Sequence, residues 1–360
     1  MLRRMRALHL AWPGAPLALV SAALFGASTP FAKLLIGRID PWMLAGLLYA
    51  ASGMGLLVLA LVRGGLGARA GEAPLRRADL PWLAGVILCG GVAGPILLML
   101  GLAATAASSA ALLLNLEGLA TMAIAWLAFR ENVDRRILAG AFAILAGAVL
   151  LSWSGGAAGF DWGALAIAGA CLAWGIDNNL TRKLSSADPV QIATIKGLAA
   201  GAINLALAFG LGASLPGADA LAGAAIVGFL GYGVSIALFV LALRHLGTAR
   251  TAAYFSTAPF IGAVLSLAMF AEPVTWQLGA AGLLMGAGVW LHLAERHAHE
   301  HVHEPMEHEH RHVHDAHHRH DHAADDPPGE PHMHRHRHGR LVHAHAHYPD
   351  LHHRHSHSAR

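Results

Sequence analysis

The sequence predicts an all-α membrane protein. We expect ten transmembrane helices, arranged as two inverted five-helix repeats, followed by a disordered cytoplasmic tail rich in histidine. Hydrophobic residues make up 55% of the 360 residues and charged residues only 13%, whereas soluble domains carry about 25% charged residues. Long apolar runs recur between residues 16 and 294, and the two halves of this region resemble each other. Together these observations exclude an ordinary soluble domain.

Ten apolar runs are long enough to cross about 30 Å of hydrocarbon at about 1.5 Å per residue. After an N-terminal segment at 1–15, the first half (16–155) is expected to hold spans near 16–36, 42–62, 80–102, 106–128 and 136–153. The second half (160–296) is expected to hold spans near 162–182, 190–211, 221–243, 250–270 and 276–294.

Basic residues predict the orientation of these spans. Placing the N-terminus in the cytoplasm also puts the Arg and Lys residues of alternate loops there, among them Arg63, Arg77, Arg135 and Lys183, and leaves little beyond Arg38 in the opposite loops. This distribution follows the positive-inside rule. No small-residue cleavage site ends a short apolar region near the N-terminus, so we expect the first helix to be retained. The chain is therefore predicted to be a multi-pass protein of a bacterial-type inner membrane, with both termini cytoplasmic.

The two halves align along their length. The segment LFGASTPFAK at 24–33 lies over AWGIDNNLTR at 173–182, and FRENVDRR at 129–136 lies over FAEPVTWQ at 270–277, which places Glu131 over Glu272. Because each half holds an odd number of spans, the second half enters the membrane from the opposite side. Inverted repeats of this kind are typical of secondary transporters, whose cargo site lies near the midplane between the halves.

These motifs and their order resemble the EamA branch of the drug/metabolite transporter superfamily over nearly all of residues 16–294. They include the FG and WG pairs in the first helix of each half, the helix at 108–131 and its partner at 250–273. The resemblance implies export of small solutes by alternating access. It leaves the cargo open, because members of this family carry amino acids, nucleotide sugars and other metabolites.

Glu117 lies near the centre of the fourth span, where an acid costs about 2.5–3.5 kcal/mol on insertion scales. Such acids usually face an interior or a watery cavity, so it is interpreted as a protonatable or cation-coordinating group, with a hydrogen-bonded structural acid as the alternative. Thr121 shares its face, whereas Asn115 does not. The neighbouring Gly118 aligns with Pro259, where the ninth span is expected to break and expose carbonyls for a cation.

A second polar group lies toward the cytoplasmic end of the sixth span and comprises Asp177, Asn178 and Asn179. Lys196 lies at similar depth in the seventh span and shares a face with Asn204 at i+8. Their similar depth allows an ion pair between Asp177 and Lys196, but the sequence does not decide whether they pair, and a role as gate, coupling pair or structural clamp stays open. We expect this group at the inner mouth rather than at the midplane.

The tail at 297–360 holds all but three of the 26 histidines and almost no apolar residues, which predicts disorder. Histidine-rich tracts are typical of metal binding, and imidazole suits nickel, cobalt and zinc. A solvated or pH-responsive tail is the alternative. The candidate ligands in its first tract are His297, His299, His301, His303, His308, His310, His312, His314, His317, His318, His320 and His322.

Two transport hypotheses follow. The first is export of a divalent transition metal, nickel or cobalt before zinc, in exchange for protons, with the tail loosely collecting ions. The second is export of a small organic metabolite such as an amino acid, with the tail buffering or sensing metal. A membrane-anchored metal store is a third alternative. No enzymatic activity, required cofactor or nucleic-acid partner is expected. The expected partners are the lipid bilayer and a small cation or metabolite, and a homodimer is compatible with the sequence.

Overall fold

A computed structural model shows ten helical segments in the ten ranges expected from the sequence, within the part of the chain that it describes. Seven of its helices are long and apolar enough, by length and composition, to cross a membrane. The described residues are 14–65, 75–129, 135–153, 161–181, 184, 188–246, 251 and 254–293, together with the backbone of 297–303, 306–312, 332–338 and 341–347.

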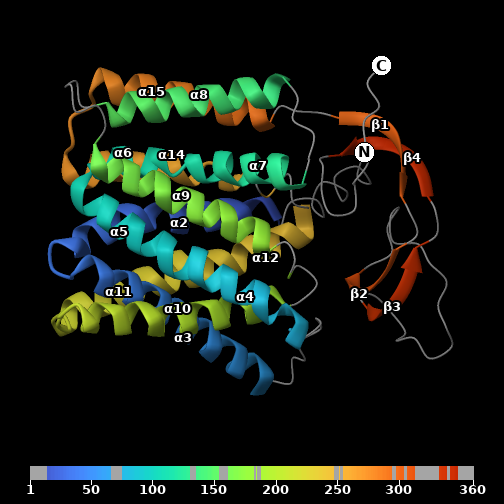
Figure 1. Ribbon diagram of the computed structural model, residues 1–360, viewed down its shortest axis with the longest axis horizontal. Coiled ribbons are helices and arrows are strands. Elements are labelled where there is room, and N and C mark those ends of the chain that lie inside the picture. Colours follow the sequence, from blue (N-terminus) through green and yellow to red (C-terminus); the bar gives the residue numbers. More distant parts are fainter. Residues whose placement is uncertain are drawn as a thin grey trace, which may run out of the picture.

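The first half begins with a helix of small and aliphatic residues and continues through helices that several short breaks interrupt (Figure 1). Its elements are α2 (Gly14–Ile36), α3 (Pro41–Gly65), η1 (Arg77–Asp79), α4 (Leu80–Val86), η2 (Ile87–Ala93), α5 (Gly94–Ala104), α6 (Ala107–Leu113), α7 (Leu116–Phe129) and α8 (Arg135–Ser152).

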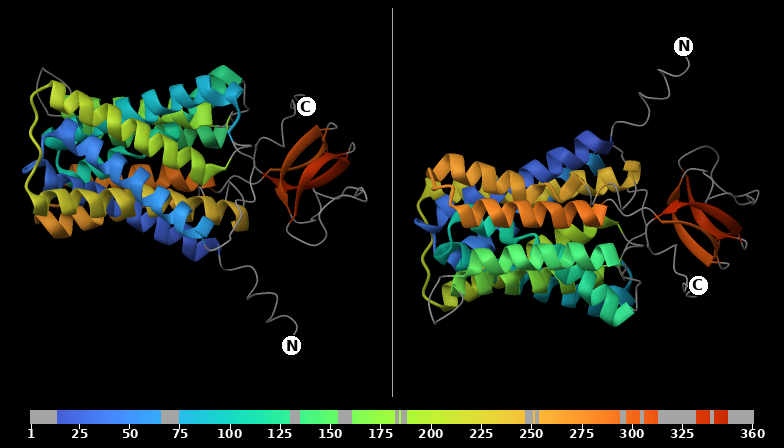
Figure 2. Two further views of the ribbon diagram at one scale, coloured as in Figure 1. Left: turned by 90° about the horizontal axis from the view of Figure 1, so that it is seen from below. Right: turned by 90° about the horizontal axis from the view of Figure 1, so that it is seen from above.

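The second half repeats this order of elements. They are α9 (Trp162–Thr181), α10 (Pro189–Gly210), α11 (Ala218–Val227), η4 (Gly228–Val234), α12 (Ser235–Leu246), α14 (Ala258–Phe270) and α15 (Trp276–Leu293). Figure 2 shows the helices of both halves lying along one common axis, as expected for a bundle that crosses a membrane.

The halves are interleaved rather than side by side. The first helix of each half packs against the fourth helix of the other, α2 on α14 and α9 on α7, while α3 pairs with α10 and α8 with α15. Small residues allow the close approach. A Cβ on Gly26 would meet the backbone of Ala258, and a Cβ on the corresponding Gly175 would lie 2.8 Å from the Cβ of Ala120. The reciprocal contacts confirm two inverted repeats related by a pseudo-twofold axis.

The backbone described in the tail forms four strands. These are β1 (His297–His303), β2 (Met306–His312), β3 (His332–His338) and β4 (Leu341–His347). β1 pairs antiparallel with β4, and β2 with β3. Histidine at every second position has the two-residue period of a strand, and the register sets histidine opposite histidine, such as His299 opposite His345. The strands lie beyond one end of the helical bundle (Figures 1 and 2).

Candidate functional site

The fourth helix of the first half is broken at residues 114–115, just before its acidic residue Glu117. α6 ends at Leu113 and α7 begins at Leu116, so Glu117 lies in the first turn of α7. Across the break, the N–H groups of Asn115 and Glu117 donate to carbonyls three residues back, at 3.0 and 3.1 Å. No proline causes this break, whereas the corresponding break at 256–257 precedes Pro259 in the first turn of α14.

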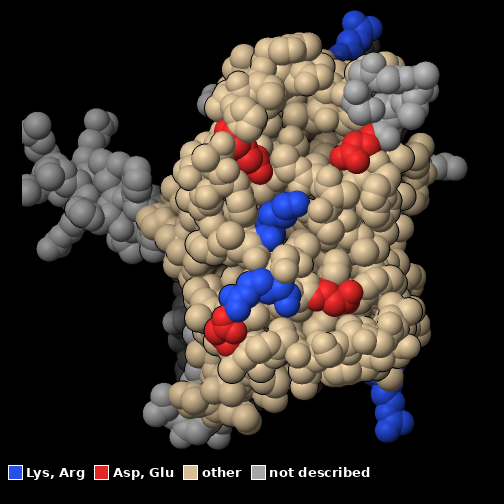
Figure 3. Space-filling model, turned by 90° about the vertical axis from the view of Figure 1, so that its left-hand side faces the viewer, with Lys and Arg blue, Asp and Glu red and all other residues tan. Residues whose placement is uncertain are grey.

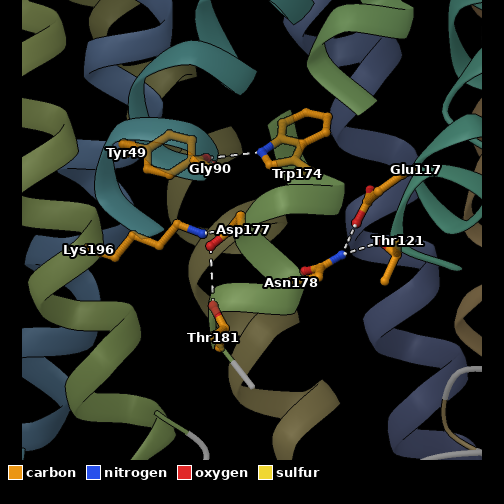
Figure 4. A network of polar contacts seen from close by, with 9 residues as sticks. All are labelled: Tyr49, Gly90, Glu117, Thr121, Trp174, Asp177, Asn178, Thr181 and Lys196. Carbon is orange, nitrogen blue, oxygen red and sulfur yellow. Dashed lines mark hydrogen bonds and ion pairs between the residues drawn. The ribbon is translucent and has the colours of Figure 1, made fainter. Parts of the chain in front are cut away.

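Glu117 is joined to Asn178 of α9. The Asn178 side-chain amide donates to Glu117 Oε1 at 3.0 Å and to Thr121 Oγ1 at 3.2 Å (Figure 4). Glu117 and Thr121 are half-buried and Asn178 is exposed. An acid, an amide and a hydroxyl therefore meet between α7 and α9. We call these three residues the Glu117 cluster.

Close packing of α9 on α7 holds this cluster together. Asn179 donates its amide to the carbonyl of Thr121 at 3.0 Å and to the carbonyl of Gly175 at 2.8 Å. Gly175, one turn earlier, presses against Ala120 and Thr121, with no room for a side chain. These contacts fix the rotation of α9, so that Asn178 points at Glu117.

Asp177 points to another side of α9 and forms an ion pair with Lys196 of α10 (Figure 4). The two side chains are only 6% and 18% exposed. Thr181 donates a further hydrogen bond to Asp177 Oδ1 at 3.2 Å. The two residues whose pairing the sequence left open therefore form an ion pair, and it neutralises the Asp177 carboxylate.

The ion pair rests on a π-helical segment, η2, that the sequence analysis did not anticipate. A Cβ on Gly90 would collide with Asp177, and a Cβ on Gly91 would lie 2.6 Å from Ala200 Cβ. Pro95, which has no N–H, follows this pair of glycines after three residues and cannot donate to their carbonyls. Side chains supply the missing donors instead: the Tyr49 hydroxyl and the Trp174 indole N–H donate to the Gly90 carbonyl at 2.8 and 3.0 Å. One backbone carbonyl therefore ties α3 and α9 to the third helix.

Asn204 of α10 makes the equivalent bond to the next carbonyl. Its amide donates to Gly91 O at 2.9 Å, and its Oδ1 is buried without a partner among the described residues. Lys196, Ala200 and Asn204 face η2 together, as their spacing predicts. In the second half, η4 occupies the position of η2 under the alignment that sets Glu131 over Glu272. π-Helical segments are often found at functional sites.

The remaining candidates lie apart from the Glu117 cluster. Asn115 is buried and donates to the carbonyl of Leu112 at 2.8 Å and toward the sulfur of Met285 at 3.9 Å. The Leu112 carbonyl also accepts the backbone N–H of Asn115, so both donors of Asn115 leave it less available to a cation. Pro259 lies in α14, which packs on α2 and α6.

Metal ligands were expected in the tail. Among the described side chains, no group of three or more His, Cys, Asp or Glu residues could hold a metal ion. The strands β1–β4 are described only by their backbone, so their histidine side chains fall outside the described part, and His314, His317, His318, His320 and His322 lie outside it altogether.

Three comparisons with known proteins bear on this site. Residues 12–153 and 161–294 each match the model of the EamA-like transporter family. A protein of Methanothermobacter thermautotrophicus named as an uncharacterized transporter is 26% identical over 292 residues, which cover 76% of this chain and 84% of the relative. A solved crystal structure superposes with a TM-score of 0.56 at 21% identity, covering 77% of this chain and 95% of the other. This structural similarity shows that the two chains share a fold.

Proposed function

The chain belongs to the EamA-like transporter family, and from this premise we propose that it exports a small cation from the cytoplasm in exchange for protons. It is a multi-pass membrane transporter that lies in the lipid bilayer. The proposal adds the direction, the coupling and the location of the site. We place the exchange at the Glu117 cluster, in an inner membrane with both termini in the cytoplasm.

The observation that carries this proposal is a difference in ion pairing: the Asp177 carboxylate has a cationic partner among the described residues, and the Glu117 carboxylate has none. Asp177 is buried and neutralised by Lys196. Glu117 accepts from a neutral amide, and no Lys, Arg or His among the described residues lies within 4 Å of its carboxylate. A carboxylate inside a membrane without a fixed cation requires a mobile one. A proton and a cationic cargo both meet this requirement.

Competition between these two ligands couples their movements. When Glu117 is ionised, it binds the cargo together with the amide oxygen of Asn178 and the hydroxyl of Thr121. When a proton arrives from the outer side, the neutral acid loses its attraction for the cargo, which is released. The cycle needs no chemical reaction, so we propose no enzymatic activity and no required cofactor.

For the cargo, we propose a divalent transition metal, nickel or cobalt before zinc. Support comes from the histidines at 297–360, which offer many imidazole ligands on one segment. The strands of this tail lie beyond the end of the bundle where α9 ends and α10 begins (Figure 1). Loosely bound ions there would raise the metal concentration at the inner mouth.

A small organic metabolite such as an amino acid is the second candidate, and one observation favours it. The Glu117 cluster consists of oxygen and amide groups, and the described side chains hold no group of His and Cys that transition metals prefer. A protonated amine could donate hydrogen bonds to the Glu117 carboxylate and the Thr121 hydroxyl here. In this case the tail buffers or senses metal.

Uptake into inverted vesicles tests the proposal. We expect nickel or cobalt uptake when the vesicle lumen is acidic. This proton-driven uptake should persist after deletion of 297–360 and should be lost in Glu117→Gln. Gly118→Ala is the matched control, because a Cβ there meets nothing within 4 Å. Proton-driven uptake of an amino acid without metal uptake would support the second candidate. Proton-driven metal uptake that persists in Glu117→Gln would refute the site.

A further inference from the structure

The connection between α5 and α6 is only two residues long, Thr105 and Ala106, yet side chains from three other segments of the chain hold it. It lies at the end of the bundle opposite the tail strands (Figure 1). Figure 3 views this end and shows basic side chains near its middle with acidic side chains around them. The charged residues involved are Lys33, Asp161 and Glu272.

Lys33 of α2 binds the C-terminal end of α5. Its ammonium donates to the carbonyls of Leu102 and Thr105, the latter at 2.9 Å. These carbonyls lie where α5 ends and have no further helical turn to pair with. Both partners belong to the first half, so this bond fixes α5 to α2 within that half.

Glu272 binds the other side of the connection and comes from the second half. Its carboxylate accepts the N–H groups of Ala107 and Ser108 at 2.8 and 3.1 Å, and also the Ser108 hydroxyl. Asp161, just before α9, accepts from the Thr105 hydroxyl at 3.3 Å. The start of α6 is therefore attached to the second half by an acid that is half-buried.

α6 links this attachment to the Glu117 cluster. It is seven residues long, with Glu272 bound at its first residues and the break at 114–115 directly after its last. A short rigid segment of this kind has one fixed end and one hinge. If the bonds to Glu272 break, α6 can turn about the hinge next to Glu117.

We propose that Glu272 is a positioning residue for transport: its hydrogen bonds to Ala107 and Ser108 latch α6 to the second half, and they break when this end of the molecule opens. Glu272 contacts neither the cargo nor Glu117. The proposal rests on the transport function, but it is independent of which cargo is carried and of the role of Glu117.

Cysteine accessibility in detergent tests the latch without any cargo. Ala110 of α6 is fully buried, so Ala110→Cys, in a background without Cys89 and Cys171, reacts slowly with a water-soluble maleimide while α6 is latched. Glu272→Gln removes the charge and leaves one acceptor oxygen for three donors. We expect it to raise the labelling rate at least about tenfold, which corresponds to about 1.4 kcal/mol.

Two controls separate this effect from general loosening. Asp219→Asn breaks the ion pair with Arg38, which lies at the same end but has side chains 57% and 66% exposed, so labelling should change less than about twofold. Ala242→Cys, buried in α12, should stay protected in Glu272→Gln. Unchanged labelling of Ala110→Cys in Glu272→Gln would overturn the proposal, as would an equal rise with Asp219→Asn or at Ala242→Cys.

A milder variant covers the case in which Glu272→Gln does not fold. Ser108→Ala deletes the hydroxyl and keeps both N–H bonds to Glu272. We expect a smaller rise in the labelling of Ala110→Cys, about threefold, because only one of the three bonds is lost. No rise in this variant would equally overturn the latch.

Discussion

Lys196→Met should destabilise the helical bundle strongly, because it leaves the Asp177 carboxylate buried without its cation. The Asp177 side chain is 6% exposed, so water cannot replace the ammonium group. Methionine matches the length of the lysine stem and is not expected to leave a cavity. The perturbation therefore isolates the charge.

The magnitude follows from the surroundings of Asp177. Removing one partner of a buried ion pair costs about 3–5 kcal/mol. Thr181 keeps one hydrogen bond to Asp177 Oδ1, and such a bond contributes about 1 kcal/mol. We therefore expect a loss near the lower limit, about 3 kcal/mol of unfolding free energy. Adding Asp177→Asn removes the unpaired charge and should restore about 2 kcal/mol of this loss.

Reversible unfolding by SDS titration of the purified protein, followed by tryptophan fluorescence, measures these free energies. The parent, both single variants and the double variant form a double-mutant cycle. An unfolding free energy of Lys196→Met within about 0.5 kcal/mol of the parent value, which is the size of a surface substitution, would refute the burial of an unpaired charge. So would a double variant that is less stable than Lys196→Met.

Three further predictions concern transport, packing and the tail. Glu117→Gln should abolish proton-driven cargo uptake into inverted vesicles while the protein elutes as a folded species on size exclusion, because only the ionisable group is lost; proton-driven uptake at the parent rate would contradict it. Gly26→Ala should lower the unfolding free energy by about 1–3 kcal/mol, because the added Cβ meets the backbone of Ala258. Gly279→Ala should leave the unfolding free energy unchanged, because an added Cβ there meets nothing within 4 Å. Equal effects of the two substitutions in SDS titration would refute this packing. Deletion of 297–360 should remove most of the nickel bound in equilibrium dialysis, and undiminished binding would place the ions elsewhere.

Much of the fold follows from the sequence because its signals are long and repeated. Apolar runs locate the helices, and the alignment of Gly26 with Gly175 anticipates two glycines with the same role in reciprocal helix contacts. That Asp177 can pair with Lys196 follows from similar depth on adjacent spans. Each of these inferences depends on spacing along one helix or on similarity between halves.

The remaining features depend on contacts between distant segments. η2 contains two glycines and precedes Pro95, which is a signal visible in the sequence. η4 has no proline at the matching position. The π-helical form that the two segments share was therefore not predictable. The hydrogen bond from Asn178 to Glu117 was likewise not predictable. The proximity of Asn178 to Glu117 depends on the rotation of α9, which Gly175 and Asn179 fix through tertiary packing. The latch residue Glu272 was seen only as an aligned position in a loop.

The interleaving of the halves has a consequence for biosynthesis. α2 leaves the ribosome before η4, α12 and α14, which pack against it and are encoded about two hundred residues later. At about 5–20 residues per second, α2 waits roughly 10–40 s in the bilayer for these neighbours. Insertion and folding are thus separated in time. The small residues along α2 face lipid during this interval, and the nascent protein acquires its native packing only when its last helices arrive.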